Sequence, residues 1–242
     1  NLLAKSVDYG SRLIITAPKF DAEKPEDLII DFYHCGLPLA HCCTTFYPFV
    51  VGWLRNYFQR LERGDIRPFG LSSKDAPSNT RVADLSMHFT DDYLKKQIDL
   101  FVKTTTARFI PVEIPLDDGR TVQIAFTGQL YNKDNPESMS PISRPVTWCD
   151  LLYQAAVDVT ADKHVYCTRY PMLDYFGSLP NRITVLSTHK TVPMYVGGKY
   201  YPNYPDVDLS MSSEQIAIIF QDSLNVSNLY LEGTGGDFDG DL

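Results

Sequence analysis

Residues 148–171, WCDLLYQAAVDVTADKHVYCTRYP, carry the pattern that decides the fold class. Apolar side chains recur at helical spacing over residues 148–159, which predicts a helix. Residues 164–168 predict a strand that ends at Arg169-Tyr170-Pro171. Helix and strand patterns follow one another along the chain without the regular βαβ alternation of a doubly wound fold. The sequence therefore predicts an α+β protein with a mixed or mostly antiparallel sheet.

The other elements are predicted from caps, turns and apolar runs. Helices are predicted over 39–61, broken at Pro48 and closed by Gly64, over 91–104 with Thr90 as cap, and over 213–224 with Ser212 or Ser213 as cap. Strands are predicted at 13–16, 108–115, 120–126, 183–187, 193–196 and 199–201. Hairpins are expected at residues 117–119, between 183–187 and 193–196, and at Gly197-Gly198. The polar stretches 70–89 and 132–145 are predicted to be connectors, and a short last element is expected at 228–231.

The composition is that of a folded globular protein, with 44% hydrophobic and 21% charged residues. No apolar run approaches the roughly 18 residues that a membrane span needs, so we expect a soluble protein of the cytoplasm without a membrane partner. The net charge of −8, from 22 basic and 30 acidic residues, disfavours a free-standing nucleic-acid binder. A catalytic core that binds magnesium nevertheless needs clustered carboxylates, and partner subunits can supply the basic side chains that contact nucleic acid.

The five cysteines include no C-x-x-C pair of the kind that zinc ribbons and redox sites use. His34, Cys35, His41 and Cys42 could be taken as zinc ligands, but their spacing lacks the usual intervals of a zinc site. We favour packing residues at a helix entry. An odd number of cysteines fits reduced thiols in a cytosol.

The chemistry is concentrated in residues 237–241, DFDGD. Asp237, Asp239 and Asp241 stand at alternate positions, and Gly240 lets the backbone bend so that the three carboxylates can converge on one cation. Magnesium suits them, because it prefers hard oxygen ligands and keeps positions open for water and substrate phosphates. Phe238 would point the other way and anchor the loop. The alternatives are a solvated acidic turn and a calcium loop, although an EF-hand loop has its glycine at the sixth position and a glutamate at the twelfth.

Residues 237–241 are similar to the magnesium-binding signature of the β′-type, largest subunit of multisubunit RNA polymerases. Three other segments resemble that family in the same order: residues 5–12 (KSVDYGSR), residues 35–38 (CGLP) running to 46–49 (FYPF), and residues 166–171 (YCTRYP) after the helix predicted at 148–159. There are also departures. Gly235 stands where the family has an Asn that touches the ribose, Thr168 replaces the Asn before the Arg, and residues 172–175 read MLDY. These departures resemble the split-subunit polymerases of large bacteriophages.

The resemblance implies a double-psi β-barrel with peripheral helices and inserted β-hairpins. It would span residues 1–242, a portion of a longer chain, with insertions at about 64–145 and 172–227. A β-type partner subunit would supply a second barrel, other subunits would complete the enzyme, and the ligands would be a DNA template, nascent RNA and nucleoside triphosphates. The polymerase would work in the cytoplasm of the host cell, and packaging in a virion stays open.

The resemblance also assigns roles to individual residues. Asp237, Asp239 and Asp241 would hold one Mg²⁺, with a second Mg²⁺ arriving with the nucleotide. Arg169 would contact the sugar of the incoming nucleotide, and Lys5 and Arg12 would contact template phosphates, the alternatives being a structural salt bridge for Arg169 and solvated charges for the other two. His164 is expected to be a packed strand residue rather than a base, and His189 and Lys190 have no assigned role. A single-chain RNA-dependent RNA polymerase of the silencing type and a non-catalytic scaffold subunit are the alternative functions.

Overall fold

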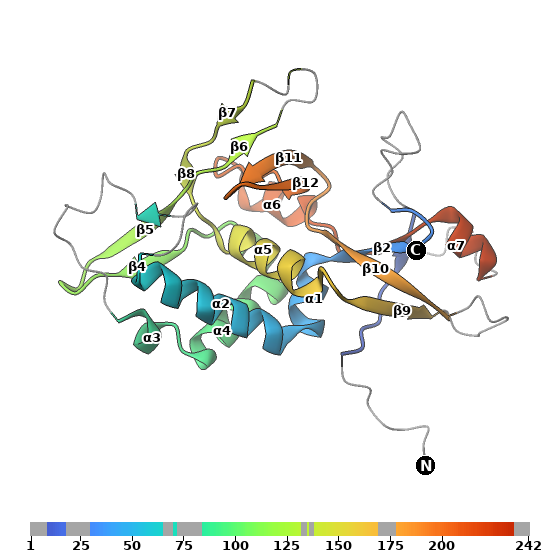
Figure 1. Ribbon diagram of the computed structural model, residues 1–242, viewed down its shortest axis with the longest axis horizontal. Coiled ribbons are helices and arrows are strands. Elements are labelled where there is room, and N and C mark those ends of the chain that lie inside the picture. Colours follow the sequence, from blue (N-terminus) through green and yellow to red (C-terminus); the bar gives the residue numbers. More distant parts are fainter. Residues whose placement is uncertain are drawn as a thin grey trace, which may run out of the picture.

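The computed structural model describes residues 9–17, 30–64, 70–71, 84–131, 135, 138–168 and 178–234 (Figure 1). Its helices are α1 (Leu39–Thr45), α2 (Tyr47–Glu62), α3 (Leu85–His88), α4 (Asp91–Lys103), α5 (Trp148–Thr160), α6 (Ser213–Ile219) and α7 (Asn228–Gly233), with a 3-10 helix at Thr105–Ala107. Its strands are β1 (Ile15–Thr16), β2 (His34–Pro38), β3 (Gly70–Leu71), β4 (Glu113–Pro115), β5 (Thr121–Phe126), β6 (Gln129–Leu130), β7 (Ser140–Pro141), β8 (Arg144–Pro145), β9 (His164–Thr168), β10 (Ser178–Leu186), β11 (Thr191–Val196), β12 (Lys199–Pro205) and β13 (Leu224–Val226). The predicted α+β class is confirmed.

A five-stranded sheet with the order β1-β13-β2-β10-β9 joins strands from both ends of the described chain. β1 is parallel to β13 and β2 is parallel to β10, whereas the pairs β13–β2 and β10–β9 are antiparallel. The sheet is therefore mixed, as expected. It follows that β1, β13 and β9 run in one direction, and that β2 and β10 run in the other.

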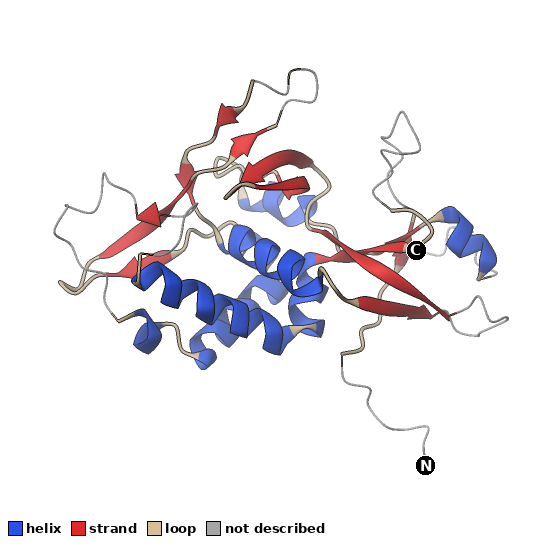
Figure 2. Ribbon diagram, viewed as in Figure 1, coloured by secondary structure: helices blue, strands red, loops and turns tan. Residues whose placement is uncertain are grey.

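Two smaller sheets are formed by the other strands. One has the order β12-β11-β6-β7, and the other joins β3, β5 and β4, with β8 also pairing with β5. Figure 2 shows the longer helices beside these strands, whereas α7 lies at the far side of the five-stranded sheet. The predicted hairpin at residues 117–119 is confirmed by the antiparallel pair β4–β5, and the turn at Gly197-Gly198 joins the antiparallel strands β11 and β12.

The helices pack around one hydrophobic core. The predicted break near Pro48 is confirmed, because α1 ends at Thr45 and Pro48 lies in the first turn of α2, where a missing N–H costs nothing. Thr90 caps α4 by accepting a hydrogen bond from a backbone N–H of its first turn. Phe58 of α2 is buried and stacks on Phe89, with 3.6 Å between the ring centroids. Among the helices of the described residues, none has both the length and the hydropathy needed to cross a membrane.

Several predicted elements are wrong in their pairing or their ends. Residues 183–187 do not pair with 193–196, because β10 lies between β2 and β9 while β11 pairs with β12 and β6. Strand partners are set by distant segments that cover each edge, which a local apolar run does not encode. The helix predicted over 213–224 ends at Ile219, since Phe220 is already extended and residues 224–226 form the buried strand β13. The predicted connectors contain β3, α3, β7 and β8.

Candidate functional site

Most residues predicted for the site lie outside the described residues. They are Lys5, Arg169, Asp237, Asp239 and Asp241. Gly235, which takes the place of the ribose-contacting Asn, lies there too. Arg12 is described, and it is exposed shortly before β1. Within the described ranges, no group of three or more His, Cys, Asp or Glu side chains could hold a metal ion.

The strand directions show at which end of the sheet β9 and β13 stop. β13 and β9 point the same way, because β13 is antiparallel to β2, β2 is parallel to β10, and β10 is antiparallel to β9. The chain that follows each of these strands therefore leaves the sheet at the same end. After β13 the sequence runs through α7 toward Asp237, and after β9 it continues directly into Arg169.

α7 is anchored to β9 close to the end of that strand. The buried Tyr230 donates a hydrogen bond from its hydroxyl to the backbone carbonyl of Cys167. Ser227 begins the helix by accepting a hydrogen bond from the Tyr230 N–H at 3.1 Å. At the other end, the buried Thr234 donates from its hydroxyl to the Leu231 carbonyl at 2.8 Å. The first turn of α7 is thus held against the last residues of β9.

Arg12 enters the sheet from the opposite end. It precedes β1, in which Ile15 lies opposite Leu224 of the parallel strand β13. The Asn225 side chain donates a hydrogen bond to the Thr16 hydroxyl at 2.7 Å and fixes this pairing. The strand polarity therefore does not bring Arg12 to the end at which β13 and β9 stop, a separation that the sequence motif could not indicate.

The CGLP segment forms β2, the strand between β13 and β10. A Cβ on Gly36 would overlap the Leu186 methyl group and lie 3.0 Å from the Asn225 Cβ, so glycine permits this close packing. Cys35 is fully buried. Hydrogen bonding to the Cys167 thiol, together with burial, raises the pKa of Cys35. This thiol is therefore protonated at neutral pH and is unsuited to act as a nucleophile.

The residues considered for zinc have other surroundings. Cys35 and Cys42 are buried on β2 and α1, which confirms the packing interpretation for these two side chains. The His34 Nδ1 lies 2.6 Å from a carboxylate oxygen of Asp31. Burial lowers the pKa of His41, whose Nδ1 has no hydrogen-bond partner within the described part of the chain.

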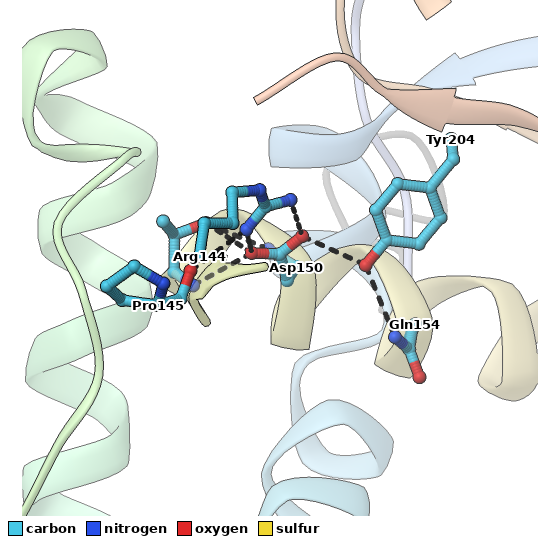
Figure 3. A network of polar contacts seen from close by, with 6 residues as sticks. Arg144, Pro145, Asp150, Gln154 and Tyr204 are labelled. Atoms are coloured by element: carbon cyan, nitrogen blue, oxygen red, sulfur yellow. Dashed lines mark hydrogen bonds and ion pairs between the residues drawn. The ribbon is translucent and has the colours of Figure 1, made fainter. Parts of the chain in front are cut away.

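A buried ion pair lies at the start of α5 (Figure 3). Two nitrogens of the Arg144 guanidinium donate to the two Asp150 oxygens at 2.7 and 2.8 Å. Asp150 also accepts from the N–H and hydroxyl of Thr147, each at 2.8 Å, and from the Tyr204 hydroxyl at 2.9 Å. Gln154 in turn donates to the Tyr204 hydroxyl at 3.3 Å.

This network stabilises the fold and is not a binding site. Burial disfavours the charge on Arg144, but the bonds with the Asp150 carboxylate outweigh it and raise the pKa of Arg144. Asp150 is fully buried, and its two oxygens are already occupied by these donors, so little capacity is left for a ligand. The T-x-x-D spacing of Thr147 and Asp150, a capping box, was the available sequence signal. The network holds the helix that leads into β9.

The prediction that His164 is packed is wrong. His164 lies on β9 as expected, but it is exposed, as are Tyr166 and Thr168, while Val165 and Cys167 between them are partly buried. Successive side chains of a strand point to opposite faces. The polar and aromatic positions of 164–168 therefore form the outer face of β9, and its apolar positions form the inner face.

Sequence comparisons assign no family to this arrangement. A scan against models of protein families finds no match, and a search of curated proteins finds no significant match either. Any functional assignment therefore depends on the sequence segments and on the geometry described above.

Proposed function

We propose that the chain is the catalytic portion of the β′-type subunit of a DNA-directed RNA polymerase, of the split-subunit kind that large bacteriophages carry. One observation carries the proposal: the chain leaves β9 toward Arg169 and leaves β13 toward Asp237 at the same end of one sheet. The resemblance assigns these two segments to a single site. Their common exit, and the hydrogen bond from Tyr230 to the Cys167 carbonyl, support that assignment.

In this proposal the five-stranded sheet belongs to a double-psi β-barrel. A mixed sheet with two parallel pairs and a non-sequential strand order is compatible with such a barrel. Across the described strands, no hydrogen-bonded pair joins β1 to β9, so closure of the barrel is itself part of the proposal. The helices α1 to α5 and the two smaller sheets would be the peripheral helices and inserted hairpins.

The donor set of the acidic run fits magnesium, because three carboxylates offer hard oxygen ligands and Gly240 permits a sharp bend between the last two. When bound, two magnesium ions would neutralise the leaving pyrophosphate and favour ionisation of the RNA 3′-hydroxyl. Asp237, Asp239 and Asp241 would hold one ion. Arg169 would donate two parallel hydrogen bonds to the sugar of the incoming nucleotide. A β-type partner would bring the cationic groups that a phosphoryl-transfer transition state also needs, so the chain alone should be inactive.

The test is Asp239→Asn in the complex reconstituted with its partner subunits. This change keeps the side-chain volume but removes one charge from the ligand set, so RNA extension on a DNA template should fall by several powers of ten. Glu232→Gln is the matched control, since Glu232 is an exposed acid of α7 just ahead of the run, and its extension should stay near normal.

Gel filtration would verify that both variants assemble, and an RNA template of the same sequence would test the silencing-type alternative. Near-normal RNA extension by the assembled complex with Asp239→Asn would refute the catalytic assignment. Preferred use of the RNA template would replace the DNA-directed reaction with the alternative.

A further inference from the structure

The outer face of β9 and β10 combines basic and aromatic side chains. The antiparallel register places His164 opposite Arg182 and Tyr166 opposite Pro180. In the parallel pair with β2, His34 lies beside Arg182. Paired residues share one face of a sheet, so His34, Arg182 and His164 form a row across three strands. The name basic-aromatic strip is used below for five residues: His34, His164, Tyr166, Pro180 and Arg182.

The basic-aromatic strip is open to solvent. Tyr166 is 71% exposed, the His34 side chain is 31% exposed, and the other three residues are exposed. The neighbouring positions Cys35 and Asn181, which point to the opposite face, are buried. Figure 1 shows β9 and β10 extending away from the helices, on the side of the molecule where α7 lies. The solvent-facing side of this strand pair is therefore available to a ligand.

Charge on the strip is only partly neutralised by the chain itself. Among the described residues, no ion pair involves Arg182 or His164. Among the described acids, Asp31 lies next to His34, and its carboxylate is engaged by His34 and by the Tyr33 N–H. In a chain with a net charge of −8, a guanidinium between two imidazoles, with no ion pair to a described acid, is a local departure from the acidic balance.

We infer that the basic-aromatic strip binds the single-stranded DNA template next to the catalytic site. The inference rests on the proposed function and deepens it. The outer face of β9 continues from His164 and Tyr166 to Thr168, and the next residue in the chain is Arg169. A nucleic-acid strand lying along the strip would thus lead directly to the residue assigned to the incoming nucleotide.

The chemistry of the strip favours an unpaired strand. An exposed tyrosine ring offers a base a stacking surface, and a guanidinium and imidazoles donate hydrogen bonds to phosphate oxygens. During templated synthesis the RNA near the site is paired with the template, whereas the template base that awaits a nucleotide is unpaired and can stack. A protein partner would need a wider apolar surface than Tyr166 and Pro180 provide.

The experiment measures binding of a fluorescent single-stranded DNA to the full chain by anisotropy, with single-stranded RNA and duplex DNA of the same sequence as comparisons. Tyr166→Ala should raise the Kd roughly 5- to 150-fold, as expected for loss of one stacked base. Arg182→Ala should lower the slope of log K against log salt by about 0.7, which corresponds to one lost phosphate contact. Tyr200→Ala and Arg120→Ala are matched controls from β12 and the β4–β5 turn, and both should bind like the wild type.

Equal binding of the duplex, or tighter binding of the RNA, would overturn the assignment to an unpaired DNA template. Wild-type affinity of Tyr166→Ala and Arg182→Ala would overturn the strip as the binding surface. RNA extension by the reconstituted complex separates the two proposals. If the complex extends RNA while Tyr166→Ala and Arg182→Ala bind single-stranded DNA like the wild type, only the assignment of the strip is refuted. If DNA binding depends on the strip but the complex makes no RNA, only the polymerase function is refuted.

Discussion

Removing the Asp150 carboxylate tests whether the buried network at the start of α5 locks the fold. Asp150→Ala deletes five hydrogen bonds, from two guanidinium nitrogens of Arg144, two groups of Thr147 and the hydroxyl of Tyr204. It also leaves the Arg144 charge, whose side chain is only 11% exposed, without its counter-ion. An uncompensated buried charge costs about 3–5 kcal/mol of unfolding free energy.

That loss is large against the roughly 5–15 kcal/mol that stabilises a typical domain. Asp158→Ala is the matched control on the same helix, because Asp158 is 40% exposed and both its ion pair with Lys199 and its hydrogen bond from the Trp53 indole lie at the surface. A surface pair of this kind contributes about 1 kcal/mol or less. Asp150→Asn keeps the shape and one acceptor oxygen, so its loss should lie between those of the two alanine variants.

The assay is urea unfolding followed by far-UV circular dichroism, with the free energy extrapolated to water. If Asp150→Ala is too unstable to purify, Asp150→Asn against Asp158→Ala still gives the comparison. If Asp150→Asn loses no more unfolding free energy than Asp158→Ala, the stabilising role of the buried network is refuted. The same measurement on Tyr204→Phe should show a smaller loss of about 1–2 kcal/mol, because the hydrogen bonds to Asp150 and from Gln154 are removed while the ion pair stays.

Three other predictions concern the five-stranded sheet. Gly36→Ala should destabilise the chain by about 1–3 kcal/mol through overlap with Leu186, whereas Gly52→Ala, exposed within α2 and free of contacts, should stabilise it by about 0.5–1 kcal/mol; urea midpoints compare them. Iodoacetamide should modify Cys167 first, since it is partly exposed and hydrogen bonding to the Cys35 thiol lowers its pKa, so its thiolate persists below the ordinary range near pH 8.5; peptide mass mapping that finds another cysteine first would contradict this. Tyr230→Phe should lower stability by about 1 kcal/mol and speed amide exchange in α7, and unchanged exchange would show that its hydroxyl does not hold the helix.

The elements that sequence reasoning predicted well have local signals. Thr90 and the acids after it mark the start of α4, Pro48 marks the first turn of α2, and helical periodicity marks α5. Each of these depends on residues within one or two turns of one another. The strand β13 is not predicted by the sequence, and its first residue falls at the end of the predicted helix, because three residues carry too little pattern; only the pairing with β1 and β2 makes it a strand.

The candidate site was predictable in its chemistry but not in its placement. The acidic run can be identified from residue types and spacing, and Arg169 is assigned by the family resemblance. That β9 and β13 stop at the same end of the sheet follows instead from pairings between strands that are far apart in the sequence. The exposed face of β9 was missed because a single His in a short strand is usually packed. Its interpretation as a binding surface depends on Arg182, which only the β9–β10 register places opposite His164.

The acidic balance of the chain does not by itself exclude a nucleic-acid ligand. Exposed charges more than about 8 Å apart are largely screened at physiological ionic strength, so a strand on the basic-aromatic strip responds mainly to the strip and its margin. There Arg182 and two imidazoles face Asp31, while acids such as Asp91 and Asp92 lie on α4 among the helices. With so few cations, contact with phosphates contributes little and stacking on Tyr166 must supply much of the affinity. Binding should therefore depend only weakly on salt, unlike that of a basic DNA-binding protein, and the slope of log K against log salt should match the one or two phosphate contacts that the strip can make.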